Sequence, residues 1–558
     1  MSLSVPQEPF LATLFQLWER HPNKTLIRQY LDGPQEATVA QFLHDVLTAR
    51  EKIWTTLSSD ARGHLRDEGT NVFVALLVGP EYPFFVLVFA LYSLGVVTVP
   101  LSPAIRPDEA LYFLKLCHTS LVITSSNTQR KGDNISNTSG ILNLTIDMPP
   151  QVEQGSHFHM QLEHTARINP QKGFVLLYTS GTTGPPKGIL LSRAAAESGI
   201  TGMIQKMGFN TSDTYAHYSP VHWIAGFRHG LSTILGGACL ELCASVFSSD
   251  WMLDRWERMA QGDAGITCWH PVPSVLQSVG DSLEAVRKTG PIGSARIPPA
   301  IRAFWRDLRE GKPLTIAYGL TEMMGFVSIS DWQSDDDVPP DCCGSVCPNT
   351  ELIIHDGELC IKSPLLLERY LSEDPEVMKK AFTAEGYYKT GDLGKLEGDQ
   401  VFVFGRASHD VIRFDGWKLM APDVESELAE HPLISQAVVV GVNDCSVGQR
   451  VAALAIVDDT SLGDRRVQLP ALRRWLAIER RMNAYKLPTL LRLIGKQHEL
   501  PSTPSGKVLK PKIRDLFFSS EALGRGLIQL YDLDAREGEI GNRPFDWAGI
   551  QAKAVVEA

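Results

Sequence analysis

One stretch of eleven residues combines glycine, hydroxyl and lysine side chains directly after an apolar run. It reads Tyr178-Thr-Ser-Gly-Thr-Thr-Gly-Pro-Pro-Lys-Gly188 and follows Phe174-Val-Leu-Leu177. Glycine lets backbone N–H groups approach an anion, hydroxyls donate to phosphate oxygens, and Lys187 supplies a cation. The stretch therefore predicts a phosphate-binding loop, whose expected phosphate-contacting residues are Thr179, Ser180, Gly181, Thr182, Thr183, Gly184 and Lys187.

This loop differs from the phosphate loop of P-loop NTPases, which needs G-x-x-x-x-G-K-[ST] running into a helix. Here Lys187 is followed by Gly188, and the apolar runs at 174–177 and 188–191 both read as buried strands. The alternative, a surface loop between two strands, would suit a short Gly-Thr-Thr-Gly fragment better than eleven consecutive positions. The pattern predicts a strand–loop–strand unit that holds phosphate.

A second motif, Ile316-Ala-Tyr-Gly-Leu-Thr-Glu322, places an aromatic ring, a hydroxyl and a carboxylate at the end of an apolar run. Tyr318 can stack on a purine, and Thr321 can bond an α-phosphate. Glu322 can bind Mg²⁺, which takes one or two carboxylates together with nucleotide phosphates. Taken alone, the motif would more often be an ordinary strand end.

Two further motifs complete the set. Tyr387-Tyr-Lys-Thr-Gly-Asp-Leu-Gly394 offers Asp392 to ribose hydroxyls, and Arg406 follows a Val-Phe-Val-Phe strand. Leu500-Pro-Ser-Thr-Pro-Ser-Gly-Lys507 places a lysine on a glycine-containing turn. In isolation these would read as a hairpin turn, a surface ion pair and a solvated lysine.

In this order and at these spacings, the four motifs resemble the adenylate-forming (ANL) superfamily of acyl-CoA synthetases, coumarate:CoA ligases, beetle luciferases and peptide-synthetase adenylation domains. The resemblance covers about residues 20 to 515. It implies an α/β fold with a large layered amino-terminal AMP-binding domain, residues 1–405, and a smaller mobile α+β domain, residues 406–558. The smaller domain would carry Lys507.

The chemistry implied by the resemblance has two half-reactions, which use ATP, Mg²⁺ and CoA. A carboxylate attacks the α-phosphorus of ATP to give an acyl adenylate and pyrophosphate, and a thiol then displaces AMP after the small domain rotates. Lys507, Glu322, Thr321 and Lys187 would be the catalytic residues, with Glu322 as the metal ligand. The nucleotide site would also include Ser294, Ala295, Gly319, Tyr318, Asp392 and Arg406.

The acid substrate should be selected near Ser219-Pro-Val-His-Trp-Ile-Ala-Gly-Phe-Arg228. Amino-acid-activating relatives carry Asp at the place of His222, which disfavours an α-amino acid. Ile224 and Arg228 lie four positions apart, on one face of a helix if this segment is helical. Resemblance to aryl-CoA ligases assigns the pocket to His222, Ile224, Arg228, Ser294, Gly319, Gly325 and Phe326, and the bulky Phe326 disfavours a long straight acyl tail.

Two questions about this region stay open. Arg228 can pair bidentately with a second carboxylate or a polar ring substituent of the substrate, or it can turn outward to an acidic neighbour. The resemblance places the hinge between the two domains near residues 405 to 410. Relatives carry Asp or Lys two residues after the arginine that corresponds to Arg406, whereas this chain has Ser408 followed by His409-Asp410, as if one residue were inserted. The pivot residue is therefore open.

The thiol acceptor also has alternatives. The resemblance places a pantetheine channel along Phe414, Gly416 and Trp417, and the first expectation is free CoA. An acyl-AMP ligase that loads the phosphopantetheine arm of a carrier protein is the second, and a luciferase-like monooxygenase is the third. A binding module without catalysis would predict a degraded site, which intact Lys187, Glu322, Asp392, Arg406 and Lys507 disfavour.

Composition bounds the remaining classes. The 558 residues carry a net charge of −11 and show no basic stripe, so nucleic acid is not the expected partner. Nine cysteines without a secretory signal favour reduced thiols and a cytoplasmic location, and the cluster at Cys342, Cys343 and Cys347 lacks the pairing of a zinc site. The uncharged run 82–105 is expected to form a buried helix and strand rather than a transmembrane segment, and residues 125–172 a surface excursion.

Overall fold

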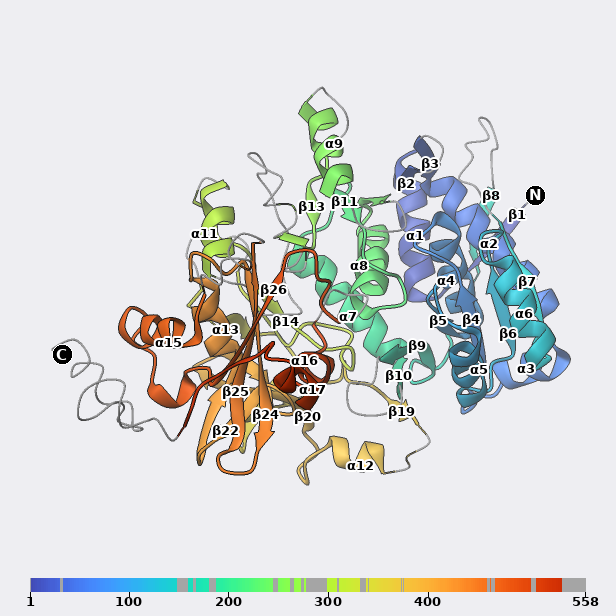
Figure 1. Ribbon diagram of the computed structural model, residues 1–558. Coiled ribbons are helices and arrows are strands. Elements are labelled where there is room, and N and C mark those ends of the chain that lie inside the picture. The colour runs from blue at the N-terminus through green and yellow to red at the C-terminus, as the bar shows by residue number, and fades with distance from the viewer. Residues whose placement is uncertain are drawn as a thin grey trace.

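The computed structural model describes residues 2–30, 34–147, 159–163, 167–179, 187–243, 249–260, 265–271, 275–276, 279, 299–308, 311–331, 338–339, 341–372, 374, 376–458, 462, 467–502 and 508–533. The predicted α/β fold is confirmed, with layers of helices and sheets through most of the chain. In Figure 1 the blue amino-terminal elements lie at one end, and the orange and red strands β22 to β26 lie towards the other.

The first large sheet carries the phosphate-loop motif. Its strand order is β19-β10-β9-β5-β4-β6-β7. The strands are β4 (Phe73–Leu77), β5 (Val97–Pro100), β6 (Leu121–Thr124), β7 (Asn143–Thr145), β9 (Gly173–Thr179), β10 (Lys187–Ser192) and β19 (Arg369–Leu371). The two predicted strands around the motif are confirmed, because β9 and β10 pair antiparallel with Lys187 opposite Thr179.

Helices connect the parallel strands of this sheet, as parallel pairing requires. They are α4 (Tyr82–Leu94), α5 (Pro107–Leu116) and α6 (Gln129–Ser139). Every residue of α4 from Tyr82 to Ser93 is buried, and Gly95 ends the helix with φ of 74°. The expectation of a buried helix followed by a strand is confirmed, and no helix among the described residues is long and apolar enough to cross a bilayer.

The expected surface excursion at 125–172 contains regular structure in its first part. Residues 129–139 form α6, and β7 pairs in parallel with β6 at the sheet edge. The polar composition concealed this helix, because it buries only Gly132 and Ile135 against the rest of the protein. A helix at the edge of a sheet needs only a narrow apolar stripe.

A five-stranded sheet of order β13-β11-β12-β2-β3 supports the acid-pocket segment. It consists of β2 (Thr25–Tyr30), β3 (Pro34–Thr38), β11 (Thr214–His217), β12 (Cys239–Leu242) and β13 (Cys268–Trp269), and β1 (Ser2–Pro6) pairs separately with β8 (His159–Glu163). The surrounding helices are α1 (Pro9–Arg20), α2 (Val39–Thr56), α3 (Ser59–Leu65), α7 (Arg193–Met207), α8 (Ile224–Leu235), α9 (Ser249–Ala260) and α11 (Pro299–Leu308). One apolar core joins α1, α2, α3, α7 and α8 to both sheets, whereas α9 and α11 contribute to a separate apolar cluster around Trp269.

A second seven-stranded sheet brings two of the motifs together. Its order is β14-β15-β16-β21-β20-β18-β17, and α12 (Val377–Ala381) precedes β20. The strands are β14 (Ala317–Tyr318), β15 (Ser328–Ile329), β16 (Cys342–Val346), β17 (Glu351–His355), β18 (Glu358–Lys362), β20 (Tyr388–Glu397) and β21 (Gln400–Arg406). The Tyr318 motif and the Asp392 motif therefore belong to one sheet.

The last sheet draws its strands from residues after β21 and has the order β23-β22-β25-β26-β27, with β24 paired to β25. The strands are β22 (Val411–Phe414), β23 (Trp417–Met420), β24 (Gln436–Asp444), β25 (Gly448–Val457), β26 (Leu490–Gly495) and β27 (Gln529–Leu530). Its helices are α13 (Ala421–Ala429), α15 (Leu469–Ile478), η1 (Ala484–Lys486), α16 (Lys510–Phe517) and α17 (Ser520–Gly524). Residues 519–533 supply β27 and bury Tyr531 in the core of this sheet.

Candidate active site

Three predicted nucleotide residues meet in one hydrogen-bonded group. The Tyr318 hydroxyl donates to Asp392 Oδ2 at 2.6 Å, and Arg406 Nε lies 2.8 Å from Asp392 Oδ1. Asp392 and Arg406 face each other in the register of β20 and β21. Gly391 makes this approach possible, since its φ is 75° and a Cβ there would lie 3.1 Å from Arg406 Nη1.

Glu322 lies in a second hydrogen-bonded group, and Lys187 of the phosphate-loop motif lies near that group. Its Oε1 accepts a hydrogen bond of 2.8 Å from the Tyr370 hydroxyl, which also lies 2.8 Å from the Tyr388 hydroxyl. Lys187 Nζ stands 5.6 Å from the centre of the Tyr370 ring. The pairing of β10 with β19 thus brings a residue of the first motif towards the carboxylate of the second.

Electrostatics connects the two groups. Burial lowers the pKa of Arg406, but the nearby charges of Asp392 and Glu322 outweigh burial and raise it. Burial and the adjoining carboxylates raise the pKa of Tyr318 and of Tyr370, so both hydroxyls remain neutral donors. Arg406 therefore pairs with Asp392 and lies within electrostatic range of Glu322 as well.

Several predicted residues lie outside the described part of the chain. Thr179 is in β9, but its side chain is not described. Ser180, Gly181, Thr182, Thr183, Gly184, Ser294, Ala295 and Lys507 fall wholly outside the described residues. Thr321 is half-buried in the turn after β14, directly before Glu322.

The acid-pocket segment is helical from Ile224 onward, which meets the condition under which Ile224 and Arg228 share one face. Trp223 is the N-cap of α8, so Ile224 and Arg228 stand one turn apart. Gly226 permits the tight entry into this helix, because a Cβ there would lie 2.2 Å from the carbonyl oxygen of Pro220. Burial lowers the pKa of His222 to about 4, so this side chain is uncharged at neutral pH.

Arg228 turns inward. Its side chain is buried, its Nη1 donates to the carbonyl of Met324 at 3.2 Å, and its guanidinium carbon lies 4.2 Å from the centre of the Phe326 ring. The alternative of an outward arginine paired to an acidic neighbour is wrong. Gly319 adjoins the same ring, since a Cβ there would lie 3.6 Å from Phe326 Cδ1, and Gly325 O would be 3.3 Å away.

Two histidines that the sequence prediction missed line this region. His229 follows Arg228 on α8, and His270 follows β13; their ring centres are 4.2 Å apart. The His270 ring also lies 6.4 Å from that of Phe326. Burial lowers the pKa of His270 to about 3 and that of His229 well below its usual value. The only hint of this pair in the sequence was that His229 adjoins Arg228. No motif pointed to His270.

The three residues predicted for the CoA channel have different environments. The Phe414 ring is buried in the core of the last sheet, so only its backbone can contribute to a channel in this structure. Gly416 has φ of 80° and open space where a Cβ would stand. Trp417 is 39% exposed and stacks on Tyr485 with ring centres 4.7 Å apart.

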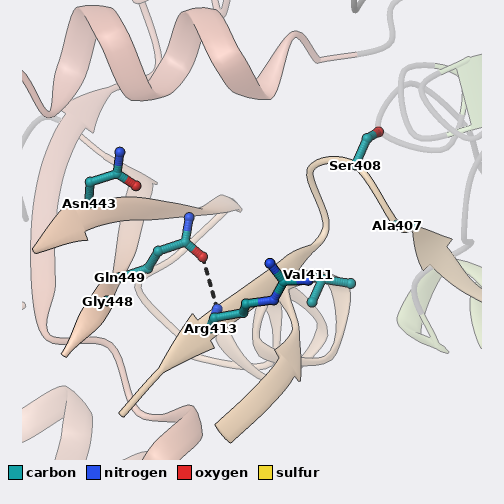
Figure 2. Close-up of a pocket in the computed structure, with 7 residues that line it drawn as sticks. All are labelled: Ala407, Ser408, Val411, Arg413, Asn443, Gly448 and Gln449. Carbon is teal, nitrogen blue, oxygen red and sulfur yellow. Dashed lines mark hydrogen bonds between the residues drawn. The ribbon is translucent and has the colours of Figure 1, made fainter. Parts of the chain in front are cut away.

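A cavity of about 370 Å³ lies beside the hinge (Figure 2). It is lined by Ala407, Ser408, Val411, Arg413, Asn443, Gly448 and Gln449. Gln449 Oε1 accepts from the Arg413 backbone N–H at 2.9 Å, which ties β25 to β22. None of the predicted nucleotide or acid residues lines this cavity.

The hinge segment is held by one buried charge group. Asp410 accepts from the Arg406 backbone N–H at 2.8 Å and pairs with Lys510 at 2.5 Å, and Lys510 also pairs with Glu425 at 2.9 Å. Burial raises the pKa of Asp410, but the charge of Lys510 outweighs burial and lowers it. Lys510 opens α16, so the segment just after the predicted catalytic lysine is tied to the hinge.

Glu322 is the candidate ligand for a hard cation such as magnesium. Among the described residues no three His, Cys, Asp or Glu side chains are placed to hold a metal ion, and the cysteines are free thiols. Glu322 is a carboxylate beside hydroxyls, in the place predicted for nucleotide phosphates. Magnesium needs little more from a protein, because phosphate and water oxygens complete its shell.

Comparisons with known proteins agree with this arrangement. A family model described as AMP-binding enzyme matches residues 60–371, and one described as AMP-binding enzyme C-terminal domain matches residues 423–507. The acyl-CoA ligase oryP of Aspergillus oryzae is 28% identical over 538 residues, which cover 92% of this chain and 93% of that protein. A malonate–CoA ligase of Arabidopsis thaliana is 27% identical over 486 residues, covering 79% of this chain and 77% of that protein.

A solved structure shares the fold. O-succinylbenzoate coenzyme A synthetase from Bacillus subtilis, in complex with ATP and magnesium ion, superimposes with a TM-score of 0.69 at 21% identity. The match covers 90% of this chain and 99% of that one.

Proposed function

Because this chain belongs to the AMP-binding enzyme family and is an ATP-dependent acid:CoA ligase, we propose that the side chains around Asp392 and Glu322 form its nucleotide site. The reaction joins a carboxylic acid to ATP as an acyl-AMP intermediate and then transfers the acyl group to the CoA thiol. AMP and pyrophosphate are released.

The ribose is assigned to Asp392. Its carboxylate is held by the Tyr318 hydroxyl and by Arg406, and carboxylate oxygens can accept further bonds from two vicinal hydroxyls. Tyr318 is itself fixed by that hydrogen bond, which presents its ring at a constant angle to a purine. Arg406, paired with Asp392, would supply a positive charge near the phosphates.

The phosphates are assigned to the Glu322 group. Glu322 would hold Mg²⁺, which neutralises phosphate charge when bound. Tyr370 orients the Glu322 carboxylate through its hydroxyl, and Thr321 can donate to an α-phosphate oxygen. Lys187, above the Tyr370 ring, adds a positive charge on the side of the phosphate loop.

In the first half-reaction an oxygen of the substrate carboxylate forms a bond to the α-phosphorus while the bond to pyrophosphate breaks. The protein contributes position and charge neutralisation, since phosphoryl-type transfers need little covalent help. In the second, the CoA sulfur forms a thioester bond as AMP leaves. Lys507, Thr182 and the other residues outside the described part keep their roles as predictions.

Three further expectations stay predictions of this proposal. They are the division of the chain at residue 405, a cytoplasmic location, and a pantetheine path along Gly416 and Trp417.

The identity of the acid substrate is also a proposal. Two of the compared proteins are named for acids with two carboxylates, malonate and O-succinylbenzoate, so acids of that class are the first candidates.

The observation that carries the assignment is the convergence of Tyr318, Asp392 and Arg406 within hydrogen-bonding distance, with Glu322 close enough to act on the same arginine. The test is acid-dependent exchange of labelled pyrophosphate into ATP, followed by addition of CoA. We expect acyl-CoA and AMP in equal amounts. Exchange without acyl-CoA, but with acylation of a carrier protein, would replace CoA by a carrier thiol, and unchanged exchange in Asp392→Asn would refute the site.

A further inference from the structure

Arg228 is a buried cation whose interactions are incomplete. Its side chain is 5% exposed, it donates one hydrogen bond to the Met324 carbonyl, and its Nε is buried with no hydrogen-bond partner among the described residues. No carboxylate in the described part of the chain pairs with it. A buried charge without an opposite charge costs stability, so its retention needs a reason outside folding.

Other buried arginines of this protein are better satisfied. Arg193 pairs with Glu8 at 2.5 Å, and Arg255 pairs with Glu241 at 2.5 Å. Arg473 donates to two carbonyls, at 3.2 and 2.7 Å, and lies over the Tyr531 ring. Arg193 also has a buried Nε without a hydrogen-bond partner, but its guanidinium pairs with Glu8. Of these four arginines, Arg228 alone has neither a carboxylate partner nor a second carbonyl bond in the described part of the chain.

The surroundings of Arg228 are polar but uncharged. His229 and His270 stand beside it, and each has a buried ring nitrogen without a hydrogen-bond partner, Nε2 and Nδ1 respectively. Burial lowers the pKa of Arg228 only to about 10, so it stays protonated at neutral pH while both histidines stay neutral. The wall therefore has one net positive charge and spare hydrogen-bonding capacity.

The position of this charge relates it to the acid. The Phe326 ring centre lies 4.2 Å from the guanidinium carbon, and the same ring adjoins Gly319. Gly319 is exposed and follows Tyr318 directly, two positions before Thr321. One aromatic ring therefore spans the space between the buried cation and the loop assigned to the α-phosphate.

We propose that Arg228 binds a second, distal carboxylate of the acid substrate and so makes this enzyme selective for short dicarboxylic acids. This rests on the proposed function, in which the other carboxylate of the same acid reacts at the α-phosphate. The guanidinium offers parallel N–H donors that match a carboxylate. A matching monocarboxylic acid would leave the buried cation unpaired, which is how a polar site rejects an analogue lacking its partner.

The test compares wild type with Arg228→Met in pyrophosphate exchange. Malonate, succinate and glutarate serve as diacids, and propionate, butyrate and valerate as monoacids of matching length. We expect wild type to prefer the best diacid, and Arg228→Met to lower kcat/KM for it by about 100-fold or more, mainly through KM. Activity with monoacids should change by only a few fold and the KM for ATP should be unchanged.

A second readout separates recognition from folding. Because methionine removes an unpaired charge and fills much of the same volume, the melting temperature of Arg228→Met should equal or exceed that of wild type. The matched control is Arg193→Met, which strands Glu8 and should lower the melting temperature. Added diacid should raise the melting temperature of wild type and leave that of Arg228→Met unchanged.

Three results would overturn the inference: equal loss of diacid and monoacid activity in Arg228→Met, a lowered melting temperature with unchanged selectivity, or a wild type that prefers monoacids. Acid-dependent exchange with monoacids alone would refute this inference and leave the proposed function intact. Exchange with no acid in a wider panel would refute the proposed function itself.

Discussion

Tyr318 and Asp392 lie 74 positions apart in the sequence and share a hydrogen bond of 2.6 Å between hydroxyl and carboxylate. The bond exists because β14 and β20 belong to the same seven-stranded sheet. Arg406 reaches the other oxygen of the same carboxylate from β21. The proposed nucleotide site is thus built on strands, whose positions are more constant than those of loops.

Replacing Asp392 by Asn should weaken ATP binding. The change removes the charge that faces Arg406 and weakens the acceptor for ribose hydroxyls, so the Kd for ATP should rise about 10- to 100-fold. Isothermal titration calorimetry measures this directly. The control is Asp444→Asn, which breaks a comparable pair with Arg450 at 2.6 Å in the last sheet and should leave the Kd unchanged. Equal effects of the two substitutions would contradict the assignment.

Glu322→Gln should impair adenylation through the metal. Loss of the carboxylate is expected to lower exchange on the order of 100-fold and to raise the magnesium concentration needed for half-maximal rate. A magnesium titration of the exchange rate provides the measurement. Tyr370→Phe is the control, since it removes the hydroxyl that orients Glu322 and keeps the carboxylate. A Glu322→Gln enzyme with an unaltered magnesium dependence would show that the metal is held elsewhere.

Asp410→Asn should destabilise the hinge region. Lys510 would keep only Glu425, so the cost in free energy of unfolding should be about 2 kcal/mol, below the ~3–5 kcal/mol for a wholly unpaired buried charge. Urea unfolding measures the change. The control is Asp423→Asn, which breaks the ion pair with Lys486. Because Asp423 is more exposed than Asp410, this change should cost less than about 1 kcal/mol. A hinge that tolerates Asp410→Asn as well as Asp423→Asn would argue against this role of the pair.

Acid should destabilise the protein through its buried histidines. Burial lowers the pKa of His217 to about 4, so between pH 6.5 and 4 the unfolded state binds a proton that the folded state does not. The stabilising contribution is present above the unfolded pKa near 6.5 and is lost as pH falls towards 4. Each such histidine adds up to about 1.4 kcal/mol per pH unit to the slope.

The measurement is the free energy of unfolding against pH for wild type and His217→Gln. Between pH 6.5 and 4, the free energy of unfolding of the variant should depend less steeply on pH, by up to about 1.4 kcal/mol per pH unit. Leu142→Gln, at an exposed side chain that does not titrate, should keep the wild-type slope. A wild type whose stability rises on acidification between pH 6.5 and 5 would refute the argument.

Local patterns predicted the strands around the phosphate motif and the α4–β5 unit, because long apolar runs must be buried wherever the rest of the chain lies. They did not predict α6, because most of its residues are polar and only Gly132 and Ile135 are buried. The helix at 224–235 was only a condition of the sequence argument about Ile224 and Arg228, and the structure shows that the condition holds. The close approach of Gly226 to Pro220 at the start of this helix became visible only in the structure.

The sequence by itself determined the nucleotide chemistry, since residue types at short spacings within each motif already carry the hydroxyls, carboxylates and cations that ATP requires. Only the tertiary structure decided that Arg228 faces inward, and that His229 and His270 flank it. The direction of a helical side chain depends on which elements pack against the helix, and those come from β13 and from the segment after Glu322. Such contacts between distant segments have no signature in the order of residues along one chain.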